Sequence, residues 1–503
     1  MTSTTTSRGR SRRRRARGLA GTLGLTLAST VLPGSGMLYA GRRVLGLLLL
    51  VPALALFGCL AWYVVRDPQA ALDVAFDPAR LTVVTTVAVA VLLVWVLNVV
   101  LTYVMVRPGE RRRGETLLGG AFVLLMCVAV AAPLGVVARY SMVQKHVVQH
   151  VFQHNKSATA PVDVTEQDPW GGRDRVTVLL LGGDGNVHRP GVRTDSVVLA
   201  SIDVHTGRTV LFSLPRNLMR VPFPRRSPLH ALYPDGFTGP GDPAEWLLNA
   251  VYRNVPALHP GVLGRSDNEG ADAVKQAVAG ALGLHVDYYL LVNLAGFRSI
   301  VQAIGGVTVN INQPIPIGGN TDLGIPPDGY LQPGPHQRLN GFQALWFARG
   351  RYGSDDYQRM ERQRCMIDAI INEAQPLNLL RRYEKLAAVG QEIVRTDIPS
   401  DLLSAFVDLA TEVKGSQVRS VVFRASAQFA PSNPDYAWMH QKVRTALRSG
   451  TSGPAGPTHT PTPSATATPS PTTTPTTTPT TTPTTDPADA TDAADACGYH
   501  PVS

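Results

Sequence analysis

Three long apolar runs constrain the fold of this chain more than any other feature. They cover residues 44–65, 81–106 and 117–138 and contain no charged side chain. A helix of about 20 apolar residues is long enough to cross the hydrocarbon core of a bilayer. The sequence therefore predicts three transmembrane helices within residues 44–140, and it excludes one compact soluble domain.

The charges between these runs predict how the chain is oriented. The loop over residues 107–116 carries four arginines, whereas the loop over residues 66–80 carries two arginines against three aspartates. Basic loops stay on the cytoplasmic side of a membrane. Residues 1–18 are also rich in arginine, so we predict a cytoplasmic amino terminus and an extracytoplasmic position for everything after residue 140. The net charge of +10 is concentrated in these membrane-flanking segments, which argues against a nucleic-acid-binding protein.

A fourth apolar stretch, over residues 19–43, is harder to interpret. It is broken by Pro33 and Gly34 and ends on Arg42 and Arg43. A full crossing here would place one of two basic ends on the wrong side of the membrane, so we predict an interfacial or re-entrant segment. A true fourth span remains the alternative. No small-residue cleavage site follows, so a cleavable signal peptide is not indicated.

The carboxy-terminal region, residues 449–503, is dominated by Thr, Pro, Ala and Ser in repeated TTTP units. Such a composition lacks the apolar side chains needed for a core, so the sequence predicts a disordered tail. Its predicted exterior position leaves both O-glycosylation and a plain spacer role open.

The four cysteines fall into two groups. Cys59 and Cys127 lie inside apolar runs, where cysteine behaves as a small hydrophobic residue. Cys365 and Cys497 would both lie outside the membrane, where oxidation is permitted, but nothing in the sequence shows whether they pair. No Cys/His pattern with metal-ligand spacing is present.

After a linker over residues 141–173, residues 174–448 have the pattern of one domain. Short apolar runs alternate with helical patterns, and the first run, VTVLLLG, is apolar enough for a strand buried on both faces. We predict an α/β fold, a three-layer sandwich with a central mixed sheet covered by helices. The predicted strands are residues 176–182, 196–203, 209–215, 288–293 and 306–312, and the predicted helices are residues 244–255, 270–283, 295–306 and 356–374. A long loop rich in Pro and Gly is expected after residue 312.

Polar residues gather at the predicted ends of the first three strands. Asp184 follows the first strand, Arg193 and Asp195 lead into the second, and Arg216 follows the third. Ligands of α/β folds bind at the carboxyl ends of strands. Two aspartates there could share a divalent cation such as Mg²⁺, although a turn residue and a simple ion pair are the ordinary alternatives for Asp184 and Asp195.

A second group of polar residues follows later in the chain: Arg349, Arg351, Arg359, Arg362 and Gln363. The last three occupy positions i, i+3 and i+4 of one predicted helix face. Any one of these arginines could be an ordinary surface cation, but together they indicate an anion-binding site. The guanidinium group binds phosphate through two parallel hydrogen bonds and keeps its charge.

The order of these motifs resembles the LytR-CpsA-Psr family of envelope phosphotransferases over residues 175–374. The segments that carry the resemblance are VTVLLLGGDGN, RTDSVVLASID, SLPRN, LLNAVY, VDYYLLVNLAGFRSIVQAIGGVTVNI and LNGFQALWFARGRYGSDDYQRMERQ. The family resemblance implies a transferase that takes a glycopolymer from a polyprenyl pyrophosphate and joins it, usually to peptidoglycan, as a phosphodiester. It also implies an apolar pocket for the lipid between the sheet and the helices.

The resemblance assigns roles to the polar residues already singled out. Asp184 and Asp195 would hold Mg²⁺ (or Mn²⁺) or lie beside the pyrophosphate, and either could be the general base. Catalysis would fall to Asp184, Asp195, Arg193 and Arg216. The expected pyrophosphate-binding residues are Arg193, Arg216, Arg349, Arg351, Arg359 and Gln363, with Arg362 beside them.

Three residues depart from the family pattern. Asn186 stands where an arginine is frequent, and Asn217 and Asn340 stand where aspartates are frequent. We therefore expect activity with altered metal or substrate preference. The three predicted transmembrane helices also outnumber the single transmembrane helix that is common in the family.

Two alternatives to transfer remain open at the level of sequence. One is a hydrolase that uses the same arginines without a sugar acceptor, and the other is a non-catalytic lipid-binding regulator. The sequence does not identify the polymer: its Ala, Gly, Arg and Pro content suggests a GC-rich actinobacterial source, which leaves teichoic-acid-like polymers, arabinogalactan and capsular glycans open.

Overall fold

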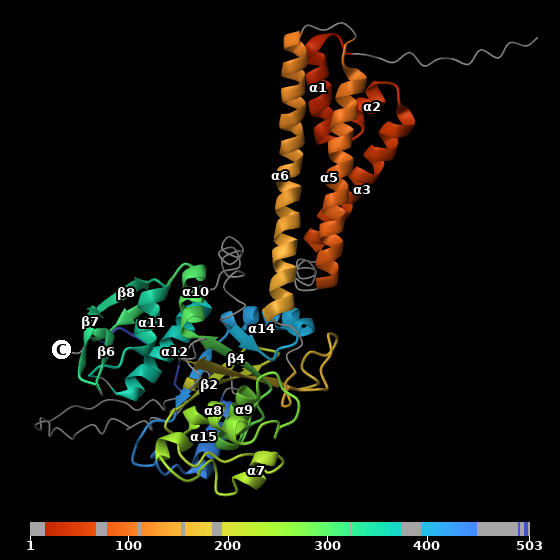
Figure 1. The fold of residues 1–503 in the computed structure, drawn as a ribbon. Helices are drawn as coiled ribbons and strands as arrows, with labels where there is room; N and C mark the ends of the chain where they lie inside the picture. The colour runs from red at the N-terminus through yellow and green to blue at the C-terminus, as the bar shows by residue number, and fades with distance from the viewer. Residues whose placement is uncertain are drawn as a thin grey trace, which may run out of the picture. The chain divides into compact units, whose positions relative to one another are not determined.

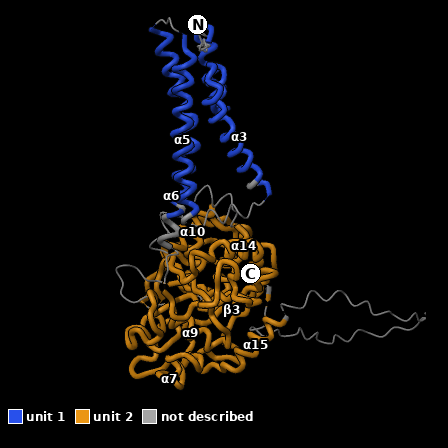
Figure 2. Tube along the Cα trace, turned by 90° about the vertical axis from the view of Figure 1, so that its right-hand side faces the viewer, with its two compact units in different colours: residues 1–150 blue, residues 151–503 orange. Residues whose placement is uncertain are grey.

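The computed structural model describes most of the chain, in ten segments. These are residues 16–66, 78–108, 113–151, 156–183, 194–321, 323–353, 355–373, 394–449, 491–492 and 497–500. The chain divides into two compact units, residues 1–150 and residues 151–503 (Figure 2). Each unit is described by itself.

Three long apolar helices dominate the first unit (Figure 1). They are α3 (Arg43–Arg66), α5 (Pro78–Val106) and α6 (Arg113–Val151). Their stretches Arg43–Trp62, Arg80–Val106 and Arg113–Val143 are long and apolar enough to cross a membrane. The three predicted spans are therefore confirmed as helices, and they make this unit a membrane anchor.

The apolar stretch before α3 forms two short helices, α1 (Gly18–Val31) and α2 (Ser35–Tyr39). The 14 residues of α1 rise only about 21 Å, less than the thickness of a bilayer core. α1 buries a polar stripe against α5 and exposes Leu27 and Val31. At its end, Asn98 of α5 donates to the carbonyl oxygen of Ser29 at 2.9 Å, and its side-chain oxygen accepts from the backbone N–H of Gly34 at 3.1 Å.

The second unit is built on a mixed sheet. Its described strands are ordered β11-β10-β3-β2-β1-β4-β9. Their bounds are β1 (Arg175–Gly183), β2 (Thr194–Asp203), β3 (Thr209–Leu214), β4 (Tyr288–Asn293), β9 (Val394–Thr396), β10 (Val418–Val422) and β11 (Thr491–Asp492). β1 pairs parallel with β4 and antiparallel with β2, while β3 pairs antiparallel with β2 and parallel with β10. The carboxyl ends of β1, β3, β4 and β10 therefore meet at one edge of the sheet.

Helices cover both faces of this sheet, which confirms the predicted α/β sandwich (Figure 1). One face packs against α8 (Leu248–Leu258), α9 (Glu269–Leu282) and α15 (Tyr436–Ser449). The other packs against α14 (Leu403–Lys414) and part of α12 (Asp356–Glu373). Side chains alternate between these two cores along each strand, because successive strand residues point to opposite faces.

A smaller core lies beside the sheet. It joins α10 (Leu294–Ile304), α11 (Gly341–Arg349) and α12 to the paired strands β5 (Val307–Ile311) and β8 (Gly334–Leu339). A second small ribbon pairs β6 (Ile315–Asn320) with β7 (Ile325–Leu331). The prediction of a Pro- and Gly-rich loop after residue 312 is therefore wrong, because these residues form the strands β6, β7 and β8, and strands tolerate Pro and Gly at edges and bulges.

One predicted helix is divided in the structure. Residues 244–255 were expected to form a single helix, but the chain forms a 3₁₀ turn, Pro243–Trp246, and then α8. Between them Leu247 is extended and pairs with Met219 in an isolated β-bridge. A long-range backbone pairing therefore interrupts a segment whose local pattern favours a continuous helix.

The end of the chain returns to the second unit. β11 pairs antiparallel with β10, and a disulfide joins Cys365 of α12 to Cys497, with their Cα atoms 5.1 Å apart. The pairing that the sequence left open is thus present. Residues 449–503 were predicted to be a disordered tail, but the described residues at its far end belong to the folded domain, whereas residues 450–490 lie outside the described residues.

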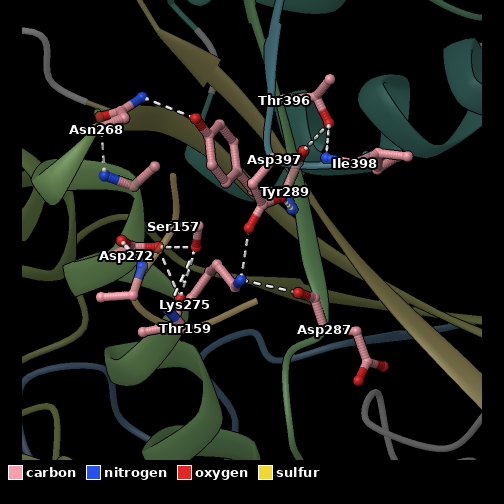
Figure 3. Close-up of polar contacts among 12 residues, drawn as sticks. Ser157, Thr159, Asn268, Asp272, Lys275, Asp287, Tyr289, Thr396, Asp397 and Ile398 are labelled. Atoms are coloured by element: carbon pink, nitrogen blue, oxygen red, sulfur yellow. Dashed lines mark hydrogen bonds and ion pairs between the residues drawn. The ribbon is translucent and has the colours of Figure 1, made fainter. Parts of the chain in front are cut away.

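A buried polar cluster ties the sheet to α9 (Figure 3). The Lys275 ammonium lies 2.7 Å from Asp397 Oδ2, and both side chains are 0% exposed. The second oxygen of Asp397 accepts from the backbone N–H of Tyr289 in β4 at 2.7 Å, and Lys275 also donates to the carbonyl oxygen of Asp287 at 2.8 Å. Burial raises the pKa of Asp397, against the opposing effect of Lys275. This pair links α9, β4 and the segment after β9.

The segment after residue 155 is fastened to the same helix. Asp272 of α9 accepts hydrogen bonds from the hydroxyls of Ser157 and Thr159 at 2.6 and 2.7 Å, and from the backbone N–H of Ala158 at 3.0 Å (Figure 3). Part of the predicted linker over residues 141–173 is therefore packed against the domain.

Candidate functional site

The candidate site lies at the edge where the carboxyl ends of β1, β3 and β4 meet. Asp195 is the second residue of β2, beside the end of β1 at Gly183. Pro215 ends β3, and Arg216 follows it. The predicted placement of Asp195 and Arg216 at strand ends is confirmed. Asp184 and Arg193 lie outside the described residues, so their assignment stays a prediction.

Two arginines and two aspartates alternate at the centre of the site. Arg216 Nη1 donates to Asp195 Oδ1 at 2.7 Å, and its Nε lies 3.5 Å from Asp356 Oδ1. The same oxygen of Asp356 lies 2.8 Å from Arg359 Nη2, which also donates to the Asp195 carbonyl oxygen at 3.2 Å. Residues from β2, the end of β3 and α12 are thus joined by one ionic network.

Asp356 is a site residue that the sequence analysis missed. It begins α12 and lies one helical turn before Arg359, so the pair has the i, i+3 spacing of an ion pair on one helix face. That spacing was readable in the sequence. What it did not show is that Arg216, from the end of β3, would contact the same carboxylate.

Burial sets the electrostatics of this network. Arg359 is only 5% exposed at its side chain, and burial lowers its pKa while Asp356 opposes that shift. Within the described part of the chain, Asp356 Oδ2 and Arg359 Nε are buried without a hydrogen-bond partner. A buried polar atom without a partner is costly, so a polar ligand that reached these two atoms would be stabilised by them.

Gln363 and Ser196 extend the network away from the aspartates. Ser196 Oγ donates to Gln363 Oε1 at 2.9 Å, and Gln363 Nε2 donates to the carbonyl oxygen of Ala348 at 3.3 Å. Gln363 therefore lies between β2 and the end of α11. Ser196 was not predicted as a site residue, because a serine inside a strand carries no distinctive signal.

Arg349 and Arg351 lie at the end of α11 and are exposed. They line a cavity that Asp195, Arg216 and Arg359 also line. The Arg349 guanidinium lies over the ring of Trp346, 5.2 Å from its centroid. Asn340, one of the departures from the family pattern, caps the other end of α11: its side chain accepts from the backbone N–H of Gln343 in a capping box. An amide performs this capping role as well as a carboxylate.

Arg362 differs from the other predicted arginines. Its Nε donates to the carbonyl oxygen of Phe347 at 2.7 Å, and its Nη2 donates to that of Gly350. Burial, with Arg359 nearby, lowers the pKa of Arg362 to about 10. Arg362 does not line the cavity, so its contacts are those of a residue that holds the end of α11 in place.

A cavity of about 490 Å³ connects this network to an apolar interior. At its polar end are Asp195, Ser196, Arg216, Arg349, Arg351, Arg359 and Gln363. Its apolar walls come from β1, β2 and β4 and from three helices, with side chains that include Leu180, Val198, Leu290, Phe297, Ile367, Ile370 and Ile371. The predicted apolar pocket between sheet and helices is present, and the arginines line the same cavity.

The shape of this cavity suits an amphiphile with an anionic head. The arginines can neutralise a diphosphate, and the apolar walls can enclose a hydrocarbon chain. No group of three potential metal ligands occurs among the described residues. Asp195 nevertheless lines the cavity and shares Arg216 with Asp356, whose Oδ2 is a buried oxygen without a partner. Mg²⁺ is often bound by one or two carboxylates together with substrate phosphates, so this donor set fits it.

Comparisons with known proteins identify relatives of this chain. The model of the LytR_cpsA_psr family matches residues 139–446. The polyisoprenyl-teichoic acid–peptidoglycan teichoic acid transferase TagU of Enterococcus faecalis is 27% identical over 252 residues, which cover 49% of this chain and 67% of that protein. The protein of the same name from Oceanobacillus iheyensis is 29% identical over 239 residues, which cover 47% of this chain and 62% of that protein. The alignment therefore spans about two thirds of each relative.

Among solved structures, that of Bacillus subtilis TagV is 23% identical. The match covers 55% of this chain and 97% of the TagV chain, with a TM-score of 0.38.

Proposed function

Since this chain belongs to the LytR_cpsA_psr family, we propose that it transfers a glycopolymer from a polyprenyl-pyrophosphate carrier to peptidoglycan through a phosphodiester bond. The observation that carries the proposal is a single cavity that is lined both by apolar side chains and by Arg216, Arg349, Arg351 and Arg359. A lipid-linked pyrophosphate likewise has an apolar hydrocarbon chain joined to an anionic head group. The relatives named above are teichoic acid transferases, which makes a teichoic acid the first polymer to test.

In the proposed reaction an acceptor hydroxyl attacks the phosphorus that carries the sugar. The new P–O bond forms as the bond to the bridging oxygen breaks, and polyprenyl phosphate leaves. Arg216 and Arg359, which contact Asp195 and Asp356, would neutralise the charge on the leaving group. The hydroxyl proton must pass to a base. Among the residues that the structure describes, Asp195 is the candidate.

The proposal includes a divalent cation. Asp184 and Asp195 would hold Mg²⁺ (or Mn²⁺), and the unpartnered oxygen of Asp356 is a further candidate ligand. When bound, the cation would supply a positive charge that neutralises phosphate oxygens opposite the arginines.

Product analysis tests transfer against hydrolysis. The full chain in detergent is given a lipid-linked teichoic acid precursor with and without peptidoglycan oligosaccharides. We expect a polymer–peptidoglycan phosphodiester, seen by mass spectrometry, and little release of lipid phosphate unless acceptor is present. Equal release with and without acceptor would instead favour the hydrolase, and binding without turnover would favour a lipid-binding regulator.

We also propose that α1 and α2 form a re-entrant hairpin, with both ends on the cytoplasmic side. Ala16, Ala40 and Val106 pack together, and the backbone N–H of Ala16 donates to the carbonyl oxygen of Val106 at 3.0 Å. The chain therefore enters and leaves the hairpin at the level of the end of α5. The polar inner face and apolar outer face of α1 are typical of a helix within lipid. The disulfide in the second unit suits an oxidising exterior.

Labelling of single cysteines tests this topology in cells that carry a chain without Cys59 and Cys127. We expect Arg17→Cys and Arg42→Cys to react with an impermeant maleimide only after permeabilisation, whereas Val162→Cys, 97% exposed, should react in intact cells. Reaction of Arg17→Cys and Arg42→Cys from opposite sides would establish a fourth span, and reaction of all three from one side would contradict the proposed orientation.

A further inference from the structure

We propose that the last described residues, 497–500, form a staple that positions the apolar half of α12 for the lipid tail of the substrate. The proposal rests on the proposed function and adds positioning residues to the same site. We call these four residues, with the Cys365–Cys497 disulfide, the carboxy-terminal staple.

The staple joins α12 to β5 across the small core. Cys497 is bonded to Cys365, which is buried within α12. Asn310 of β5 donates its side-chain amide to the carbonyl oxygen of Cys497 at 2.7 Å. Asn312 donates to the carbonyl oxygen of Gly498 at 3.1 Å and accepts from the backbone N–H of His500 at 2.8 Å. Four contacts, one of them covalent, therefore hold this peptide between the helix and the strand.

Arg364, next to Cys365, provides a second link between α12 and the carboxy-terminal residues, through β10. Arg364 Nη1 donates to Ser420 Oγ in β10, and the backbone of Ser420 lies opposite Thr491 in β11. Residues near the carboxyl end of the chain are thus linked to α12 in two places, one beside β5 and one beside β10. Such a double attachment is what a positioning element requires.

Cys365 divides α12 into two parts with different surroundings. The part before it carries Arg359 and Gln363, which are held by polar contacts to β2. The part after it presents Ile367, Ile370 and Ile371 to the apolar end of the cavity. An ion pair of Glu373 with Arg338 holds the end of this second part, but the Arg338 side chain is 47% exposed, and exposed ion pairs contribute little.

This division gives the staple a distinct signature. Loss of the disulfide should loosen the apolar part of α12 and leave the arginine network in place. Binding of a long lipid tail should then weaken, while binding of the pyrophosphate group alone should not. A disulfide that only stabilised the fold would instead reduce the fraction of folded protein and leave the affinity of the remainder unchanged.

The experiment compares three forms of the full chain in detergent: wild type, C365S/C497S, and the matched control C59S/C127S. The control removes the two free cysteines of the first unit. Dissociation constants are measured for a long-chain polyprenyl pyrophosphate, a short-chain analogue and inorganic pyrophosphate. Near-UV circular dichroism reports whether each form is folded.

For C365S/C497S we expect the long-chain dissociation constant to rise about twofold to thirtyfold, the range found for residues that act through a neighbour. The short-chain constant should change less, and the constant for inorganic pyrophosphate should stay at the wild-type value, as should all three constants of C59S/C127S. An unchanged long-chain constant, or an equal rise for all three ligands, would overturn the staple. If wild type bound none of them, the proposed function itself would fail, and the staple with it.

Reduction of the wild-type protein covers the case in which C365S/C497S does not fold. Dithiothreitol transfers two electrons to the disulfide, leaving two thiols and its own cyclic disulfide, and reoxidation reverses the change. The same selective loss of long-chain binding is expected after reduction, with recovery on reoxidation. Long-chain binding that is unaffected by reduction would contradict the proposal.

Discussion

Replacing Arg216 with alanine should lower the rate of transfer by a factor of about 10²–10³, the loss found when one charge-stabilising donor is removed from an active site. Arg216 is the residue that contacts both carboxylates of the site, Asp195 and Asp356. Its loss leaves these two aspartates without their shared cation. The anionic leaving group then meets more negative charge and one guanidinium fewer.

The measurement is the initial rate of phosphodiester formation with a lipid-linked donor and a peptidoglycan acceptor. Arg225→Ala is the matched control, because Arg225 is exposed and does not line the cavity. Arg216→Lys should recover only part of the rate, since an ammonium keeps the charge but cannot bridge two carboxylates through a planar fork. Wild-type rates in Arg216→Ala would show that this network is structural and that the chemistry occurs elsewhere.

Replacing Lys275 with methionine should destabilise the second unit by about 3–5 kcal/mol, the cost of removing one partner of a buried ion pair. Lys275 and Asp397 are both 0% exposed. Methionine has similar length and no charge, so Asp397 would be left buried with its Tyr289 N–H partner and without its cation. The carboxylate would take up a proton more readily, because burial already raises its pKa.

Thermal unfolding of the full chain in detergent, followed by tryptophan fluorescence, measures this effect, and we expect a fall in midpoint of roughly 10 °C. Asp163→Asn is the control, because it removes an ion pair with Arg173 in which the Asp163 side chain is 59% exposed. Exposed pairs contribute about 0–1 kcal/mol, so its midpoint should hardly move. Equal midpoints for Lys275→Met and wild type would mean that water or a rearranged neighbour replaces the ammonium.

Much of the fold could be predicted from local patterns. The three spans, the buried strands β1 to β3 and the helix α12 are each specified by a run of neighbouring residues, whose hydropathy or period does not depend on distant contacts. The strands after residue 312 were missed, because Pro and Gly obscure the strand pattern there. The division at Leu247 was missed because its cause, the bridge to Met219, lies elsewhere in the chain.

The candidate site was predictable in part. Strand ends and arginine spacing identified Asp195, Arg216, Arg349, Arg351, Arg359 and Gln363, and the structure brings all six to one cavity. Spacing along a helix also suggested Arg362, whose contacts are with the backbone at the end of α11. Asp184 and Arg193 remain predictions.

By itself, the sequence determined the membrane anchor, the α/β class and the residue types that can bind an anion. Hydropathy and periodicity act over a few neighbouring residues, so they can be read along the chain. Only the tertiary structure decided that Asp356 shares Arg216 with Asp195, that Arg362 donates to the backbone at the end of α11, and that Cys497 returns to α12. Each of these joins residues far apart in the sequence, and their proximity depends on how the sheet and its helices pack.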